Sequence, residues 1–509
     1  MTGQTLGHYR IESKTRDEQF ERQAAWKVLP RGTGEAARRR FRKERLEGLW
    51  YVSAPRWLLL FVFSCLPLPA GDWPRFRGPN GSGVADTTGL RAEFGPSKNV
   101  VWKTPLPAGH SSPILSGDRI LLTVVEEPKL FTLCLSRRTG RVLWRRECPR
   151  PRAEPLDKRN HPASPTPAAD GQNVFVFFPD FGLVSYGWDG HERWRTPLGP
   201  YNNIYGMGAS PILAGDKVIL VCDQSRDSFA AAFGKGDGRL RWKTSRPEAV
   251  SGHSTPILYQ PGKGPLQILA PGSFRMDAYS SDTGEILWWA NGLTSEMKST
   301  PVLGADTVYI NGYNTPRNDP GNQIQAPAFA DVDADQDGRI ARAEAGDAAR
   351  YFPFIDLDRD GWLTPAEWKT YQASMAAENG LLAIRMDGSI RWKYQRAVPQ
   401  LPSTLLYRGV LYMINDGGIL TTLDPATGQV FKQGRLRGAV DNYFASPVAA
   451  DGKVFFLSLA GIVSVLRAGP EQEILAVNEL DDECLATPAI ADGRIYIRTR
   501  SALYCFGES

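Results

Sequence analysis

Two twelve-residue stretches of the chain carry acidic residues at the same spacing. Residues 333–344 (DADQDGRIARAE) have aspartate at places one, three and five, glycine at place six and glutamate at place twelve. Residues 356–367 (DLDRDGWLTPAE) repeat this arrangement. It is the spacing of an EF-hand loop, in which oxygen atoms surround a Ca²⁺ ion and the glycine allows a sharp bend. Two tandem copies with the same places filled predict a pair of calcium sites.

The place of each residue within its loop predicts its part in holding the ion. Carboxylates at places one, three, five and twelve and the backbone carbonyl at place seven supply the oxygens. The apolar residues Ile340 and Leu363 at place eight would couple the two loops. A calcium-free acidic segment is the alternative. The predicted ligands are Asp333, Asp335, Asp337, Arg339 and Glu344 in the first loop, and Asp356, Asp358, Asp360, Trp362 and Glu367 in the second.

The rest of the chain repeats itself at intervals of about 40 residues, a period typical of propellers and solenoids. Each unit opens with a small residue and proline, continues through two apolar strands and a third, and ends in a tryptophan strand. A glycine in the last turn precedes the tryptophan by four residues, and we expect the tryptophan to fill the gap between neighbouring sheets. These pairs are Gly140 and Trp144, Gly190 and Trp194, Gly238 and Trp242, Gly284 and Trp288, and Gly388 and Trp392.

Eight units can be counted, and they begin near residues 111, 164, 209, 254, 299, 402, 445 and 486. The last unit stops after its third strand, while a solitary tryptophan strand, residues 100–105 (VVWKTP), precedes the first. The N-terminal strand can complete the last blade and so remove the open sheet edges. The sequence therefore predicts an all-β, eight-bladed propeller over residues 99–509, closed by its two ends. A linear solenoid would leave both fragments unpaired.

The calcium loops interrupt the fifth unit of this repeat. That unit runs from residue 299 to 313 and resumes at residue 380. A loop between two paired strands tolerates a folded insertion because its ends lie close together. We therefore expect a small α-helical EF-hand pair, residues 326–378, between the second and third strands of blade five. It could act as a lid, a docking arm or a stability clamp.

Polar residues in the loops between blades are candidates for a second site at one mouth of the channel. His110, His253 and Lys298 each stand three residues before the proline that opens a unit. Together with Asn203 and Tyr205 they could donate ligands to a bound molecule or cofactor. The alternative is that they bond only to water and backbone. No nucleophile–base pair is recognisable in the sequence, so no catalytic residue is predicted.

The repeat resembles the pyrroloquinoline-quinone-type β-propeller family, whose unit carries A-x-D-x-x-T-G-x-x-x-W and which includes outer-membrane assembly lipoproteins. Residues 278–288 (AYSSDTGEILW) and 422–432 (TLDPATGQVFK) show it best, although Lys432 stands at the tryptophan place. Residues 72–84 (DWPRFRGPNGSGV) resemble the mature start of secreted members. The resemblance covers about residues 72–509, apart from the insertion. It implies either a binding or scaffolding protein or a quinone-dependent enzyme.

The positions of the cysteines help to distinguish a binding protein from a quinone-dependent enzyme. Quinone-binding dehydrogenases of the family would call for two adjacent cysteines, and no two cysteines are adjacent here. We therefore favour Ca²⁺ without pyrroloquinoline quinone, and a binding protein rather than an enzyme; an oxidoreductase with the quinone in the channel is the alternative. Buried thiols are favoured over a disulfide framework. The cysteines that follow the leader are Cys134, Cys148, Cys222, Cys484 and Cys505.

The first 71 residues differ from the rest. Residues 1–50 resemble the start of a bacterial serine/threonine kinase domain, with Lys27 at the phosphate-binding place, but lack its glycine-rich loop and later motifs. They are interpreted as a disordered, decayed fragment or a misassigned start. Residues 51–71 contain an apolar run after a basic stretch, which predicts a signal peptide cleaved near Ala70 or an uncleaved signal-anchor. Lipidation at Cys65 is a further alternative. Residues 72–98 are an N-terminal extension of the propeller.

The charge distribution restricts the partners. Lys and Arg total 60 and Asp and Glu 55, a net charge of +5, but residues 1–56 hold 13 basic and 7 acidic residues. The remainder therefore has 47 basic and 48 acidic residues, a net charge of −1, and a nucleic-acid partner is not expected. We expect a periplasmic or secreted protein that binds a protein or cell-envelope ligand on a propeller face. Membrane contact would come only through an uncleaved or lipidated N-terminal segment.

Overall fold

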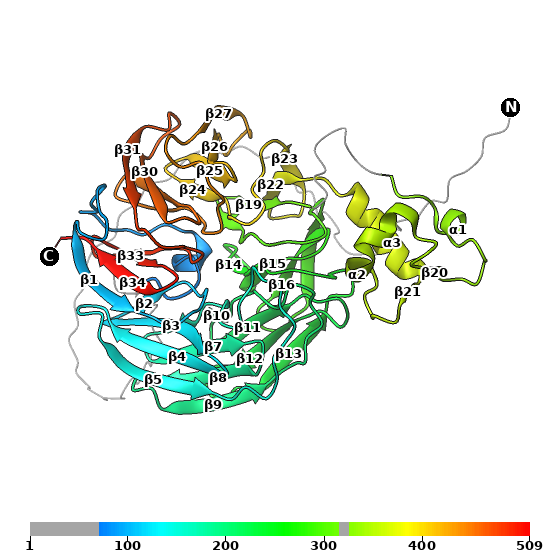
Figure 1. The fold of residues 1–509 in the computed structure, drawn as a ribbon, viewed down its shortest axis with the longest axis horizontal. Coiled ribbons are helices and arrows are strands. Elements are labelled where there is room, and N and C mark those ends of the chain that lie inside the picture. The colour runs from blue at the N-terminus through cyan, green and yellow to red at the C-terminus, as the bar shows by residue number, and fades with distance from the viewer. Residues whose placement is uncertain (1–70, 315–324, 509) are drawn as a thin grey trace, which may run out of the picture. The chain divides into compact units, whose positions relative to one another are not determined.

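The computed structural model describes residues 71–314 and 325–508. The described residues form eight four-stranded antiparallel sheets arranged in a ring, which confirms the predicted eight-bladed propeller (Figure 1). Their innermost strands are short and have no exposed residue, while the fourth strands carry the exposed outer surface. The predicted kinase-like segment and almost all of the export segment lie outside the described residues.

The strands follow one another in sequence order from the inside of each blade to the outside. Blade one is β2 (Ile114–Ser116), β3 (Arg119–Glu126), β4 (Lys129–Ser136) and β5 (Val142–Cys148); blade two is β6 (Ala168–Ala169), β7 (Asn173–Phe178), β8 (Gly182–Gly187) and β9 (Glu192–Pro197). Blade three is β10 (Ile212–Ala214), β11 (Lys217–Cys222), β12 (Phe229–Gly234) and β13 (Leu240–Ser245); blade four is β14 (Ile257–Tyr259), β15 (Gln267–Pro271), β16 (Arg275–Ser280) and β17 (Ile286–Asn291). Blade five is β18 (Val302–Leu303), β19 (Thr307–Gly312), β22 (Gly380–Arg385) and β23 (Ile390–Tyr394); blade six is β24 (Leu405–Tyr407), β25 (Val410–Asn415), β26 (Ile419–Leu423) and β27 (Val430–Arg435). Blade seven is β28 (Val448–Ala450), β29 (Lys453–Leu457), β30 (Ile462–Arg467) and β31 (Ile474–Glu479); blade eight is β32 (Ala489–Ala491), β33 (Arg494–Arg498) and β34 (Ala502–Phe506), completed by β1 (Val100–Pro105).

Blade eight joins the two ends of the propeller. Strand β1 pairs antiparallel with β34, with Val100 opposite Phe506 and Thr104 opposite Leu503. The outer strand of the blade therefore comes from the beginning of the chain and its three inner strands from the end. The predicted closure is confirmed, and it gives β34 the partner that an open ring would lack.

Tryptophans of the fourth strands connect neighbouring blades as predicted. The indole of Trp144 donates its N–H to the carbonyl of Trp188 in the next blade, at 3.1 Å, and its ring lies against Gly190. A Cβ atom on Gly190 would come within 2.8 Å of that ring, and the backbone there has a φ of 81°. The turn glycine is therefore required both by the left-handed backbone and by the neighbouring tryptophan. Trp102, Trp194, Trp242 and Trp392 make the same two contacts. The predicted Trp288 differs, because its indole N–H donates to the Gln267 side chain of its own blade at 2.9 Å.

The segment that precedes β1 crosses one end of the channel, a placement that the sequence did not predict. Trp73 is fully buried and exchanges two backbone hydrogen bonds with Leu115 of blade one, at 2.8 and 2.9 Å. Further along, Arg77 donates to the carbonyl of Thr404 in blade six at 3.0 Å, and Ala85 bonds to Ala449 of blade seven. The short 3-10 helix η1 (Pro79–Gly81) lies between these contacts, near the centre of the ring (Figure 1). The segment forms a floor that closes this end of the channel.

The insertion lies between β19 and β22, the second and third strands of blade five, as predicted. It contains α1 (Phe329–Val332), β20 (Ile340–Ala341), η2 (Gly346–Tyr351), α2 (Phe352–Ile355), β21 (Trp362–Leu363) and α3 (Pro365–Ala376). Its own core includes Phe352, Leu363 and Trp368, all buried. Of these described helices only α3 exceeds two turns, so the EF-hand assignment stays a prediction.

Candidate calcium loops and channel mouth

Each acidic loop of the insertion brings three carboxylates together. Oxygen atoms of Asp333, Asp335 and Glu344 lie within 4.8 Å of one another, and those of Asp356, Asp358 and Glu367 do the same. These are the residues at places one, three and twelve. The place-five residues, Asp337 and Asp360, are outside these clusters and accept backbone hydrogen bonds within their own loops.

The backbone of the two loops explains this convergence. Gly338 and Gly361 have φ angles of 83° and 89°, a bend that glycine adopts without strain. The N–H of each glycine donates to the first aspartate of its loop, at 3.1 and 3.0 Å. Between the loops, Ile340 of β20 pairs with Leu363 of β21, and both side chains are fully buried. The predicted place-eight pair thus does couple the loops.

Across the described part of the chain, the protein does not supply a hydrogen-bond partner for every carboxylate oxygen of these clusters. Asp333 Oδ1 is buried and has no hydrogen-bond partner in the described residues. Burial raises the pKa of the Asp356 carboxyl, and the nearby Glu367 carboxylate acts in the same direction. An oxygen-preferring cation would satisfy the orphaned oxygen and offset the repulsion between the carboxylates. The residues present therefore fit a bound Ca²⁺ ion.

The second acidic loop contacts the propeller. Asp358 forms an ion pair of 3.2 Å with Arg226, in the loop between the second and third strands of blade three. The carbonyl of Leu357 accepts a hydrogen bond of 3.1 Å from Asn202, and the Phe354 ring lies 6.0 Å from that of Tyr205. The insertion therefore touches the same loops that form the channel mouth.

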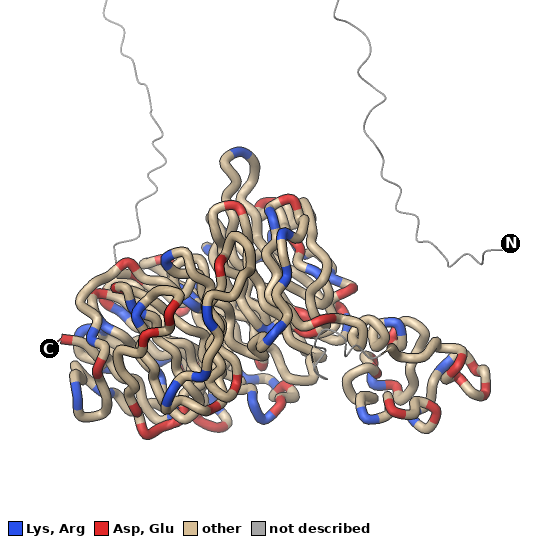
Figure 2. Tube along the Cα trace, turned by 90° about the horizontal axis from the view of Figure 1, so that it is seen from above, with Lys and Arg blue, Asp and Glu red and all other residues tan. Residues whose placement is uncertain are grey.

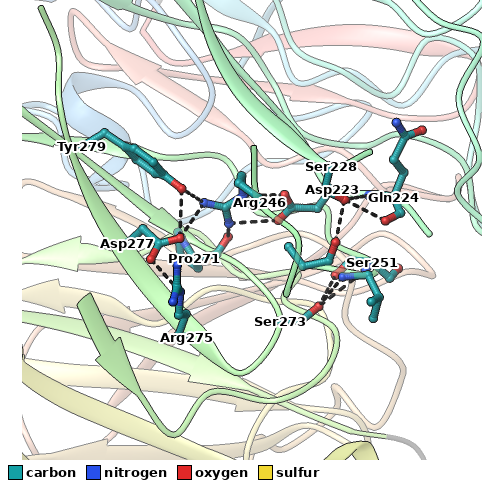
Figure 3. A network of polar contacts seen from close by, with 12 residues as sticks. Asp223, Gln224, Ser228, Arg246, Ser251, Pro271, Ser273, Arg275, Asp277 and Tyr279 are labelled. Atoms are coloured by element: carbon teal, nitrogen blue, oxygen red, sulfur yellow. Dashed lines mark hydrogen bonds and ion pairs between the residues drawn. The ribbon is translucent and has the colours of Figure 1, made fainter. Parts of the chain in front are cut away.

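A buried charge network lies close to this contact (Figure 3). Arg246 donates to both oxygens of Asp223, at 2.7 and 3.1 Å, and to Asp277 at 3.1 Å. It also bonds to the Tyr279 hydroxyl at 2.6 Å. Burial raises the pKa of Asp223, and attraction to Arg246 opposes the rise. Because Asp223 and Arg246 follow strands of blade three while Asp277 and Tyr279 belong to β16, the network ties blades three and four together.

The channel mouth holds a cavity of about 360 Å³. Four of the five predicted mouth residues line it: His110, Tyr205, His253 and Lys298. The fifth, Asn203, is buried beside the cavity, where its amide bonds to the Asp223 carbonyl and its oxygen accepts from the Tyr205 N–H. Phe76 of the floor segment also lines the cavity.

The polar groups of the mouth are largely paired with one another. Lys298 forms an ion pair of 2.6 Å with Glu296, a lining residue that no sequence pattern indicated. Burial opposes ionisation of Glu296, but Lys298 and His253 lower its pKa overall. Burial lowers the pKa of His253 to about 4, and burial together with His161 and Arg498 lowers that of His110 to about 3. The two imidazoles are therefore neutral near pH 7.

A ring of hydroxyl side chains forms the channel wall between mouth and floor. Each blade contributes one serine or threonine at its innermost strand, and the backbone N–H of one donates to the hydroxyl of the next. Seven such bonds of 2.9–3.0 Å run around the described ring. The signal in the sequence is the small residue before the opening proline of most units. The residues are Ser112, Thr166, Ser210, Thr255, Thr300, Ser403, Ser446 and Thr487.

The five predicted thiols are all free and buried in the described chain. Each lies within or beside the packed sheets, and burial raises the pKa of Cys134 to about 11. They are packing residues, and disulfides do not connect them.

None of the helices in residues 71–314 and 325–508 is long and apolar enough to cross a membrane.

The family model described as outer membrane protein assembly factor BamB matches residues 84–203, 131–317 and 363–509. Among solved structures the chain is similar to BamB from Moraxella catarrhalis, with a TM-score of 0.51 and 11% identity over 80% of this chain and 100% of that one. It is also similar to a europium-containing methanol dehydrogenase, with a TM-score of 0.55 and 9% identity over 86% of this chain and 98% of that one. For a quinohemoprotein alcohol dehydrogenase from Comamonas testosteroni the TM-score is 0.53 and the identity 11%, over 86% and 80% of the two chains. These identities establish the fold alone. A comparison with curated proteins finds no match.

Proposed function

Because the chain belongs to the family described as outer membrane protein assembly factor BamB, we propose that it is an exported calcium-binding propeller that acts as a binding or scaffolding protein. The observation that carries the calcium assignment is the convergence of three carboxylates in each acidic loop, with the buried Asp333 Oδ1 left unpaired. The family membership carries the scaffolding assignment. Residues 51–71 keep their proposed role as an export signal or anchor, which places the protein in the periplasm, outside the cell or on the membrane.

Each loop would hold its ion through the residues that the spacing predicts. In the first loop Asp333, Asp335 and Glu344 are already together, and in the second Asp356, Asp358 and Glu367 are. Asp337 and Asp360, with the carbonyls of Arg339 and Trp362, would complete the two oxygen cages. Bound Ca²⁺ would act as a structural cross-link, joining the first turn of each loop to its closing glutamate.

The propeller face that bears the mouth is the surface proposed to receive the partner. Basic and acidic residues are interspersed along the propeller trace, a distribution that suits a protein or cell-envelope ligand better than a nucleic acid (Figure 2). The insertion contacts loops of this same face through Arg226 and Asn202. A pull-down from the native envelope, with and without a calcium chelator, tests the scaffold. We expect the protein to capture one set of partners, and the chelator to abolish that capture. Capture of the same partners by an unrelated propeller would contradict the scaffold proposal.

A quinone-dependent oxidoreductase is the second candidate. The fold similarity to the methanol and alcohol dehydrogenases, together with a cavity at the ring axis, favours it. An absorption spectrum of the purified protein before and after addition of pyrroloquinoline quinone separates the two candidates. A stoichiometric bound chromophore would favour the enzyme, and an unchanged protein spectrum after gel filtration would favour the scaffold.

Replacing Glu344 and Glu367 together by glutamine should abolish most calcium binding and leave the strand content intact. The closing carboxylate supplies a large share of each site's negative charge, whereas the propeller is held by its own sheets. In the parent, calcium should slow hydrogen exchange in the insertion by mass action, and in the variant it should not. Glu285→Gln, at an exposed blade turn, is the control and should behave like the parent. Unfolding of the whole propeller on chelation would contradict the expectation that calcium stabilises only the insertion.

A further inference from the structure

A second cavity of about 430 Å³ lies beside the first and is strongly basic. It is lined by loops of blades seven and eight and by the connection between blades one and two. Lys158, Arg159, Arg498 and Arg500 contribute four positive charges to the lining and Glu483 contributes one negative charge, a formal sum of +3 with histidines neutral. His110 and His161 also line it, with their rings 4.9 Å apart. Its chemistry therefore differs from the mixed charges of the first cavity.

Arg498 is the unusual member of this group because its charge is buried without a carboxylate. The side chain is 1% exposed. Its Nη1 donates to the Ser111 carbonyl at 2.9 Å, to the Ser111 hydroxyl at 2.8 Å and to the Thr123 carbonyl at 3.0 Å. Its Nε and Nη2 have no hydrogen-bond partner among the described residues. Two nitrogens on one edge of the buried guanidinium are thus left without an acceptor in the described chain.

The buried Arg246 differs from Arg498, because carboxylates neutralise its charge. It is also 1% exposed, and it is paired with both oxygens of Asp223 and with Asp277. Arg498 has only neutral acceptors, and burial lowers its pKa to about 9. Native proteins seldom leave a buried charge unpaired, because the cost of removing it from water is then not repaid. A bound anion would give Arg498 the negative partner that Asp223 gives Arg246.

We propose that this cavity binds a small molecule bearing a carboxylate or phosphate group, with Arg498 as its buried anchor. The Nε–Nη2 edge of Arg498 is buried beside Gly109, so a bound anion would draw this side chain slightly toward the cavity, where its planar edge matches two oxygens of either group. Arg500, Lys158 and Arg159 surround the opening and would raise the local concentration of anions. The neutral imidazoles of His110 and His161 can add hydrogen bonds to the bound oxygens. The site is separate from the calcium loops and does not depend on them.

The test is calorimetric titration of the full chain with inorganic phosphate and, separately, with citrate, at constant ionic strength set by sodium chloride. Saturable one-site binding of at least one of them is expected, and their relative affinity identifies the phosphate or carboxylate source. Arg498→Lys keeps the charge but removes the planar fork, so it should weaken binding by about tenfold or more. Arg500→Gln should weaken it by about threefold, since it removes one of the surrounding charges.

The control is Arg467→Gln. Arg467 pairs with Glu473 at 2.7 Å on an exposed turn, as Arg500 pairs with Glu483 at 2.7 Å, but it lies outside the cavity. It should bind phosphate and citrate as the parent does. The proposal is overturned if neither anion binds saturably, or if Arg498→Lys and Arg500→Gln bind with parental affinity. If Arg498→Lys does not fold, a double variant with Arg500→Gln and Lys158→Gln replaces it in the test. Binding of phosphate and citrate by this double variant with parental affinity would also overturn the proposal.

Discussion

Deletion of residues 99–106 is expected to abolish cooperative unfolding of the propeller. The deleted segment contains β1, which pairs with β34 along the strand and completes blade eight. Its Trp102 donates to the Arg137 carbonyl at 3.2 Å and lies against Gly140, so the deletion also removes this tryptophan contact between blades eight and one. Loss of both leaves an open edge and a gap in a ring whose blades stabilise one another. We expect a broad, low-temperature transition in calorimetry.

The single substitution Trp102→Ala isolates the packing part of this effect. Removing a large aromatic side chain between two sheets costs on the order of 3 kcal/mol. Trp289→Ala is the matched control, because Trp289 is 53% exposed on the outer strand of blade four and its loss should cost well under about 1 kcal/mol. A deletion variant that melts like the parent, or a Trp102→Ala variant no weaker than Trp289→Ala, would refute closure by β1.

Arg246→Met is expected to lower the free energy of unfolding by about 3–5 kcal/mol, because it leaves the buried Asp223 carboxylate without its cation. Asp223 and Asp277 are almost fully buried and both bond to Arg246. Arg275→Met is the control, since Arg275 pairs with the same Asp277 at 2.8 Å but is partly exposed, and it should cost about 1 kcal/mol or less. Chemical denaturation monitored by tryptophan fluorescence measures both differences.

The pH dependence of the Arg246→Met defect follows from the same carboxylates. In the parent, burial already raises the pKa of Asp223 above its usual value, and loss of Arg246 removes the attraction that opposes the rise. A folded-state pKa above the unfolded one means that the folded variant takes up protons first as the pH falls. The variant should therefore recover part of its stability between pH 7 and pH 5 relative to the parent. A stability deficit of the variant that is constant or grows as the pH falls over this range would contradict the assignment of the defect to the Asp223 carboxylate.

The ring and its insertion were predictable because their signals are local and repeated. Each turn glycine with its following tryptophan marks one blade, and counting the blades exposed the surplus strand at 100–105 that closes the ring. The acidic loops were predictable because EF-hand spacing fixes ligand places within twelve residues. In these cases the chemistry depends on residues close together in the chain.

The floor and the second cavity could not be predicted because their contacts join distant parts of the chain. Arg77 bonds to Thr404 across 327 positions, and Arg498 bonds to Ser111 across 387. Nothing in the residues around 77 or 498 indicates these partners. The hydroxyl ring is an intermediate case, since the small residue before each opening proline was visible, but its bond to the next blade appears only when the blades stand side by side.

The central claim, that this propeller binds calcium through its inserted loops, is tested most directly by counting the bound ions. Equilibrium dialysis of the purified full-length protein against millimolar calcium, followed by metal analysis, measures the number per chain. We predict two ions per chain for the parent, one for each carboxylate cluster, and almost none for the variant with Glu344→Gln and Glu367→Gln. A parent protein that retains no more calcium than this variant would contradict the claim.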